Sequence, residues 1–119
     1  MFKNVDKLSA LPNVWFDFSA ICESPAMMYI IQKVGIKRCM WGTDYPGSML
    51  LGKPVAMGDT FYWISSEDCN NFKPATTFHP CHIVTEEFLA IEQASILLNL
   101  KDKDVEDLFY NNAYNLFNR

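Results

Sequence analysis

A strand, a helix and a second strand follow one another within residues 13–46, and this order constrains the fold more than any other feature of the chain. Residues 13–18 are rich in β-forming side chains, and residues 38–46 begin as a short apolar strand and end in a turn. Between them, Ser24 suits the N-cap of a helix and Gly35 suits its left-handed end. Strands joined in this way are predicted to pair in parallel, with a right-handed crossover.

The second strand of this βαβ unit ends on a carboxylate, Asp44, directly before Tyr45 and Pro46. Barrel enzymes commonly place a reactive group at the C-terminal tip of an apolar strand. The alternative is an Asp turn, in which the carboxylate caps the backbone of the Pro-Gly pair that follows. From these residues alone, the Asp turn is the favoured interpretation of Asp44.

Two helices are predicted in residues 85–118. The first begins after Thr85, where two glutamates suit the positive end of the helix dipole. The last helix has Asp102 as its N-cap and carries its apolar side chains on one stripe, which Asn112 alone interrupts.

Residues 47–84 form a long segment of weak periodicity between these parts, and connections in a compact domain are usually much shorter. The segment is rich in apolar and aromatic side chains, including Phe61, Tyr62 and Trp63, which predicts order rather than a solvated linker. Because it follows the strand that carries Asp44, it is either a lid or substrate wall, or a packed excursion that contacts no ligand.

The chain is acidic, with a formal net charge of −4 and a pI of about 5.0, and no cluster of lysine or arginine occurs. These properties argue against a nucleic-acid partner. No apolar run approaches the ~18 to 20 residues of a membrane-spanning helix, and the N-terminus lacks the apolar stretch of a signal peptide. We therefore predict a soluble, cytoplasmic protein without a membrane partner.

The four cysteines are irregularly spaced, which predicts reduced thiols rather than a disulfide framework. Cys69 lies upstream of His79, Cys81 and His82, and these residue types suit a structural zinc site. The spacing does not, because no Cys-x-x-Cys half-site is present. Loop histidines and a free thiol are the favoured interpretation, and either histidine could instead reach a substrate carboxylate.

Three motifs in the chain carry a resemblance to a known family. They are Asn-Val-Trp-Phe-Asp-Phe-Ser at residues 13–19, Gly-Ile-Lys-Arg-Cys-Met-Trp-Gly-Thr-Asp-Tyr-Pro at residues 35–46, and Leu-Phe-Tyr-Asn-Asn-Ala-Tyr-Asn-Leu-Phe at residues 108–117. Together they resemble the C-terminal end of the metal-dependent amidohydrolases, in the branch (amidohydrolase 2 type) that includes lactone hydrolases and aromatic-acid decarboxylases. Members of that family are (β/α)8 TIM barrels. The resemblance implies that this α/β chain supplies the last two parallel strands and the closing helices of such a barrel.

By this resemblance Asp44 is a catalytic residue that binds a divalent metal, with zinc as the expected ion, and exchanges a proton with the attacking water. A carboxylate suits both tasks, and a metal lowers the pKa of bound water toward ~7. Ser19 and Tyr45 are expected near the strand ends, in contact with a small-molecule substrate. The simpler alternatives are a helix-entry role for Ser19 and a packing role for Tyr45.

The chain departs from the family in its histidines. The family needs a His-x-His pair on its first strand, whereas His79 and His82 are the two histidines here and both follow Asp44. A full barrel also takes ~200 residues or more. We therefore expect residues 1–119 to be one partial domain, inactive alone and completed by missing barrel segments, a partner chain or a homo-oligomer.

These observations leave three alternative hypotheses for the function. The first is the C-terminal fragment of a metal-dependent hydrolase that acts on an amide, ester or lactone through Asp44. The second is a metal-dependent nonoxidative decarboxylase of the same family, in which Asp44 protonates carbon. The third is a small non-catalytic α/β binding protein, in which Asp44 caps a turn. The sequence does not separate the first two, and it does not identify the substrate.

Overall fold

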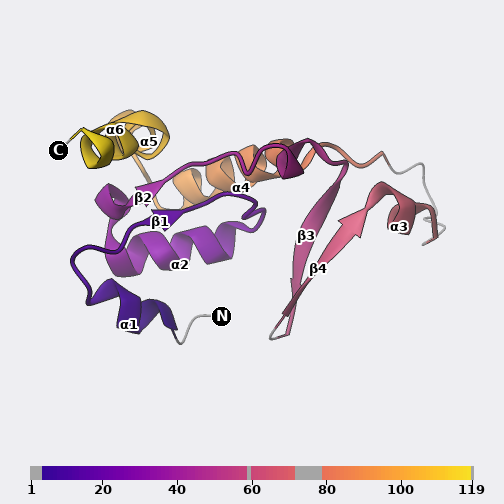
Figure 1. Cartoon of the computed structure of the whole chain (residues 1–119), viewed down its shortest axis with the longest axis horizontal. Helices are drawn as coiled ribbons and strands as arrows, with labels where there is room; N and C mark the ends of the chain where they lie inside the picture. Colours follow the sequence, from indigo (N-terminus) through magenta and orange to yellow (C-terminus); the bar gives the residue numbers. More distant parts are fainter. Residues whose placement is uncertain (1–3, 59, 72–78, 119) are drawn as a thin grey trace.

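The computed structural model describes residues 4–58, 60–71 and 79–118, without the side chains of residues 69–71. The molecule is elongated, with principal extents of 49 × 28 × 27 Å and a radius of gyration of 15.5 Å. A compact domain of this length has a radius of gyration of about 13.5 Å. Figure 1 shows the reason: a hairpin projects from a body that is formed by two short strands and the longer helices.

The predicted strand, helix and strand are present. Strand β1 (Phe16–Asp17) and strand β2 (Cys39–Met40) pair in parallel, with the first residue of one opposite the first residue of the other. Helix α2 (Ser24–Val34) joins them (Figure 1). The sequence predicted strands within residues 13–18 and 38–46. The observed ladder is shorter and pairs only two residues of each strand.

Helix α2 begins and ends for local reasons. Gly35, with a φ of +82°, ends the helix as predicted. Ser24 is its first residue rather than its N-cap, and Glu23 precedes it in an extended conformation. The Ser24 hydroxyl instead donates to Gln93 Oε1 at 2.6 Å, so this serine joins α2 to a neighbouring helix.

That neighbour is helix α4 (Ile83–Leu97). The sequence predicted that this helix begins after Thr85, and the observed helix begins earlier, at Ile83. Helix α4 packs against α2, and the short helix α1 (Val5–Ser9) packs against α2 as well. The buried apolar core combines both helices with the strand pair. Its most buried members are Phe18, Met27, Cys39, Ala90, Ile91, Ala94 and Leu108.

A π-helical turn divides the C-terminal helical segment. Helix α5 (Asp102–Glu106) leads into the turn η4 (Asp107–Asn111), and helix α6 (Asn112–Phe117) follows. The sequence predicted one regular helix with Asp102 as its N-cap. The N-cap is Lys101 instead, because its carbonyl accepts the first helical hydrogen bonds. A π turn widens the helix locally and is frequent at functional sites.

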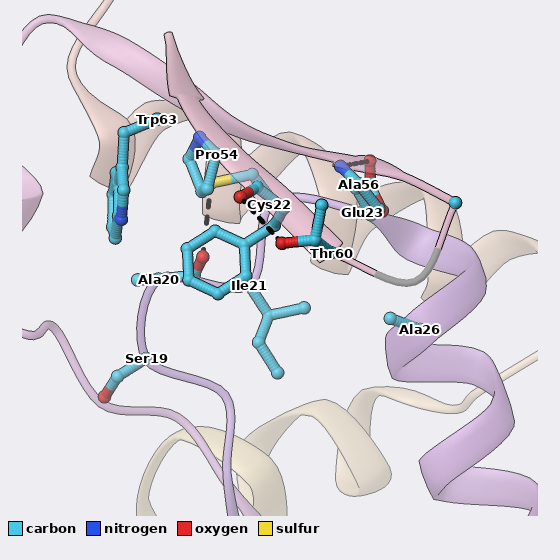
Figure 2. Close-up of a pocket in the computed structure, with 12 residues that line it drawn as sticks. Ser19, Ala20, Ile21, Cys22, Glu23, Ala26, Pro54, Ala56, Thr60 and Trp63 are labelled. Atoms are coloured by element: carbon cyan, nitrogen blue, oxygen red, sulfur yellow. Dashed lines mark hydrogen bonds between the residues drawn. The ribbon is translucent and has the colours of Figure 1, made fainter. Parts of the chain in front are cut away.

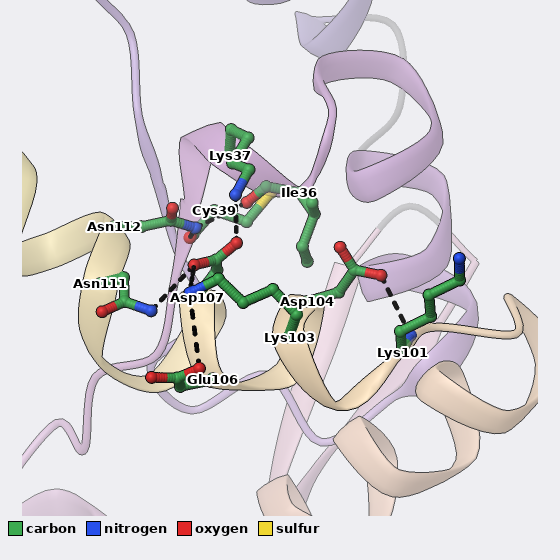
Figure 3. A network of polar contacts seen from close by, with 10 residues as sticks. All are labelled: Ile36, Lys37, Cys39, Lys101, Lys103, Asp104, Glu106, Asp107, Asn111 and Asn112. Carbon is green, nitrogen blue, oxygen red and sulfur yellow. Dashed lines mark hydrogen bonds and ion pairs between the residues drawn. The ribbon is translucent and has the colours of Figure 1, made fainter.

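The C-terminal segment is hydrogen-bonded to the region of β2 at three points. Asn112 Nδ2 donates to the carbonyls of Ile36 and Cys39, both at 2.8 Å (Figure 3). The Trp41 backbone N–H donates to the Leu108 carbonyl at 2.9 Å. The two hydrogen bonds of Asn112 explain why this polar residue lies on the inward face of its helix: it satisfies two carbonyls of the neighbouring segment.

The segment 47–84 contains secondary structure that the sequence did not predict. Strand β3 (Gly52–Met57) and strand β4 (Thr60–Ser65) form an antiparallel hairpin, and helix α3 (Ser66–Asn71) follows it. Residues 72–78 of the segment lie outside the described residues. A 3-10 turn precedes the hairpin, and another lies directly before β2.

Glycine is required where the hairpin begins. Gly52 has a φ of +145°, and a Cβ at this position would lie 2.1 Å from the Ile64 carbonyl oxygen. The neighbouring residue Leu51 forms an antiparallel bridge with His82, directly before α4. The base of the hairpin is therefore tied to the start of α4. Among the described residues, no helix is long and apolar enough to cross a membrane.

Candidate functional site at the strand ends

A short polar turn follows β1 at the C-terminal end of the strand pair. Asp17 Oδ1 accepts hydrogen bonds from the backbone N–H of Ser19, at 2.6 Å, and from the Ser19 hydroxyl. The chain that continues from β2 passes directly beside this pair at Gly42. A Cβ on Gly42 would lie 2.4 Å from Ser19 Oγ and 2.6 Å from Asp17 Oδ2, so only glycine fits.

Asp44 lies two residues beyond this contact, on an exposed turn. Its φ of +51° is a left-handed conformation, which Asp tolerates better than most residues. The backbone N–H of Tyr45 donates to Thr43 Oγ1 at 3.3 Å, and that of Ser48 donates to the Asp44 backbone carbonyl at 3.2 Å. The turn is thus held by other groups, and among the described residues no hydrogen bond occupies the Asp44 carboxylate.

Tyr45 follows Asp44 and is 77% exposed. The predicted packing role for Tyr45 is therefore not seen within the described chain. Ser19 does lie at the strand ends, where its hydroxyl is committed to Asp17. Of the two residues predicted to contact substrate, Ser19 pairs with Asp17 at the strand ends, here called the strand-end pair, and Tyr45 is exposed to solvent.

A third carboxylate, Glu87 of α4, lies behind the two loops and was missed by the sequence analysis. Its side chain is fully buried, and Oε1 accepts a hydrogen bond from the backbone N–H of Ala20. Glu87 Oε2 and the Trp41 indole Nε1 are both buried without a hydrogen bond of good geometry, although the indole N–H is close enough to lower the pKa of Glu87.

The pKa of Glu87 is raised above the ordinary value for a glutamate. Burial is the largest cause, because a charged carboxylate loses its solvation there, and the negative charges of Asp44 and Asp17 act in the same direction. The sequence placed Glu86 and Glu87 near the start of a predicted helix, and nothing in this local pattern indicated that Glu87 is buried. The contact that buries Glu87 joins it to Ala20, 67 positions away, and no local pattern reports such a contact.

A cavity of about 420 Å³, here called the hairpin cavity, lies between β3–β4 and the loop that leads from β1 into α2. Ser19 lies at one end of it, as Figure 2 shows. Most of its other lining residues are apolar, among them Ile21, Pro54, Phe61 and Trp63. The segment that follows Asp44 therefore forms one wall of a cavity that reaches the strand-end pair.

Comparison with known proteins decides the family. A family model described as amidohydrolase matches residues 3–119. The chain belongs to the amidohydrolase family. No curated protein and no solved structure matched it. Family membership indicates an enzyme of the metal-dependent hydrolase type, in a family of TIM barrels that generally bind divalent metals.

No complete metal site is assembled in the described part of this amidohydrolase. Carboxylates are suitable ligands for divalent metals, and Asp17, Asp44 and Glu87 all lie near the strand ends. Yet among the described residues no group of three histidine, cysteine, aspartate or glutamate side chains is arranged to hold an ion. Further ligands are needed to complete a site.

The predicted alternative site around His79, Cys81 and His82 is not assembled as a metal cluster in the described chain. His82 Nδ1 lies 2.6 Å from the Met49 carbonyl oxygen, and the Cys81 thiol donates to Glu86 Oε1 at 3.1 Å. Burial and the neighbouring Glu86 raise the pKa of Cys81. These residues join the hairpin base to α4, and the side chain of Cys69 lies outside the described residues.

Proposed function

We propose that this chain is the C-terminal portion of a metal-dependent hydrolase that cleaves an amide, ester or lactone. In this proposal Asp44 is one metal ligand and the group that takes a proton from the attacking water. A bound divalent ion, with zinc as the expected one, acidifies water and polarises the carbonyl. The remaining ligands come from barrel segments outside this chain or from a partner chain.

One observation supports this role most strongly. Asp44 presents an exposed carboxylate, without a hydrogen bond among the described residues, in the loop four residues beyond the end of the second of two parallel strands. In barrel enzymes the reactive groups lie at this end of the strands. A carboxylate used only as a turn cap would accept a backbone N–H, and here Thr43 accepts the nearest one instead.

The neighbouring residues support the site without reacting. The Asp17 carboxylate fixes the loop after β1 through Ser19, and Gly42 lets the chain after β2 approach that pair. Glu87 holds the loop after β1 through Ala20. The alternative is a metal-dependent nonoxidative decarboxylase of the same family, in which Asp44 would protonate carbon instead of exchanging a proton with water.

The test is Asp44→Asn in the longest protein that carries this chain. The amide keeps the size of the side chain but cannot take the proton. We expect bound metal, measured by mass spectrometry after dialysis, to fall well below one equivalent. Hydrolysis of para-nitrophenyl acetate should fall by about 10²-fold or more.

Asp102→Asn is the matched control, because it makes the same change at an exposed residue of α5. It should retain metal and turnover. Unchanged metal content and turnover in Asp44→Asn would refute the role of Asp44. Residues 1–119 alone should retain no stoichiometric zinc, because their described residues do not complete a site.

A further inference from the structure

We propose that the hairpin cavity binds an uncharged, apolar ring of the substrate, and that the hairpin determines which rings are accepted. The proposal rests on the proposed function for the reaction, but the class of ligand follows from the cavity itself. The volume of about 420 Å³ lies within the range of small-molecule sites, roughly 300 to 1,000 Å³.

One face of the hairpin forms the wall of the cavity. Pro54 lies opposite Trp63 in the ladder, and Ala56 lies opposite Phe61. All four line the cavity, because alternate residues of a strand share one face. The rings of Phe61 and Trp63 meet edge to face, with centroids 5.9 Å apart. Such a pair offers a flat apolar ring both a face and an edge to contact.

These two rings are not used by the protein's own core. Phe61 is 58% exposed and Trp63 is 51% exposed, although both lie on the cavity side of β4. Ile21 and Trp63 line the same cavity (Figure 2), and a ligand ring bound there would cover apolar surface of Phe61 and Trp63 that water now contacts.

The charge of the cavity selects against anions. Among the described residues that line it, Glu23 is the one charged residue, and Glu23 Oε1 accepts the backbone N–H of Ala56 at 2.9 Å. With one carboxylate and no cation in the lining, an anionic ligand is repelled and an uncharged one is not. The Cys22 thiol adds no charge, because burial raises its pKa to about 12.

The hairpin is held in place at both ends. The Ala56 to Glu23 hydrogen bond joins its outer part to the start of α2, and Lys53 Nζ lies 2.7 Å from Glu86 Oε2 of α4 near its base. The cavity is therefore a formed feature. Ser19 lies at its end, so a ring bound there points its substituent toward the pair of Ser19 and Asp17.

The test measures binding directly, with two probes of the same shape and different charge. Isothermal titration calorimetry on the purified protein compares naphthalene carboxamide, which is neutral, with naphthalene carboxylate, which is an anion. We expect the carboxamide to bind at least about tenfold more tightly. Equal affinities, or no binding of the carboxamide, would overturn the proposal.

Variants locate the site. Trp63→Ala removes one ring of the wall, and Ala56→Phe fills the cavity from the hairpin. Each should weaken binding of the carboxamide by about tenfold or more, while Trp63→Phe retains most of it. Tyr62→Ala is the matched control, because Tyr62 lies between Phe61 and Trp63 in β4 but does not line the cavity. Equal losses in Tyr62→Ala and Trp63→Ala would refute this location.

Two further measurements separate the alternatives. Asp44→Asn should bind the carboxamide as the wild type does, since Asp44 does not line the cavity. If turnover persists in Asp44→Asn while the probe results hold, the proposed function fails and the cavity proposal stands. If sedimentation shows a dimer that Trp63→Ala dissociates, a second copy fills the cavity and the ligand proposal is wrong.

Discussion

Glu87 is a fully buried acid whose partners come from two different loops. It accepts the backbone N–H of Ala20 after β1, and it lies against the indole of Trp41, three residues before Asp44. Because burial and the nearby carboxylates raise its pKa, the folded protein binds this proton more tightly than the unfolded chain does. Glu87 thus links protonation to the positions of both strand-end loops.

Glu87→Gln should remove this pH dependence. The ordinary pKa of a glutamate is 4.5 and the folded value is higher, so the stabilising effect of Glu87 is fully present below about pH 4.5 and is lost as the pH rises through the folded value. A glutamine still accepts the Ala20 N–H and never charges. We expect the variant to gain free energy of unfolding relative to wild type as the pH rises, measured by urea denaturation.

The exposed glutamate of the same helix, Glu92, supplies the control. Glu92→Gln should follow the wild type at every pH. If Glu87→Gln and the wild type run parallel from acid to neutral pH, the side chain of Glu87 is not the group that holds the extra proton.

At the scale of elements, one buried side chain makes two of the hydrogen bonds between the C-terminal helical segment and the region of β2. Asn112 Nδ2 satisfies the carbonyls of Ile36 and Cys39 and is itself buried. Asn112→Ala leaves both carbonyls without this partner, and we expect a loss of about 2 kcal/mol in the free energy of unfolding. Urea denaturation measures it.

Asn118→Ala is the matched comparison, because Asn118 Nδ2 also donates to a carbonyl, that of Tyr114, but at the exposed end of α6. It should change the free energy of unfolding by about 0.5 kcal/mol or less. A loss in Asn112→Ala as small as this would mean that the two hydrogen bonds of Asn112 do not stabilise the contact with the region of β2.

The π turn carries a buried carboxylate that pairs with the segment before β2. Asp107 accepts hydrogen bonds from the ammonium of Lys37 and from Asn111 Nδ2, and Lys103 Nζ lies 3.3 Å from its Oδ1 (Figure 3). These partners, Lys37 first, hold the pKa of Asp107 at about 2, below the ordinary 3.8. The stabilising effect of the charged form is therefore present above pH 3.8 and is lost as the pH falls toward 2.

Asp107→Asn should therefore be less stable than wild type at neutral pH, and the difference should shrink on acidification between pH 3.8 and about 2. Thermal unfolding followed by circular dichroism across this range measures it. Asp102→Asn, at the exposed start of α5, should show no such convergence. A difference that stays constant down to pH 2 would exclude the ion pair as its cause.

The same elements show how far local sequence signals reach. The parallel unit was predicted because its signals are local: Gly35 ends α2, and apolar spacing marks the helix. The hairpin was not, because β3 contains Gly52 and Pro54, which usually interrupt strands. A two-stranded hairpin has only edge strands, where proline is tolerated, and Gly52 is needed for its close approach to Ile64.

The candidate site also contains residues that local sequence signals indicate and residues that they do not. Asp44 and Ser19 were predicted as site residues from the strand that precedes each of them and from the family resemblance, and their roles stay predictions. The segment that carries Phe61 and Trp63 was predicted as either a substrate wall or a packed excursion, but the burial of Glu87 and the hairpin that positions the two rings were not predicted, because they depend on contacts between distant parts of the chain. Predicting these positions requires knowing how α4 and the hairpin fold back over the strand ends.

At the scale of the whole molecule, apolar side chains remain on the outside of α4. Its buried face packs on α2, whereas Leu89 is 53% exposed and Ile96 is 72% exposed, one heptad apart on the opposite side. The C-terminal helix α6 adds Phe117, which is 76% exposed. Exposed apolar surface of this kind marks an interaction face, which suits completion by further barrel segments or by a second copy.

A double substitution of Leu89 and Ile96 by lysine tests this surface on residues 1–119. The wild-type chain should associate as its concentration rises, because association removes the apolar stripe from water, and analytical ultracentrifugation measures this. The double variant should remain monomeric at the same concentrations. Asn13→Lys combined with Gln32→Lys adds the same charge at exposed polar positions and should associate as the wild type does. If both double variants associate equally, the outer face of α4 is not the contact surface, and the exposed rings of the hairpin become the next surface to substitute.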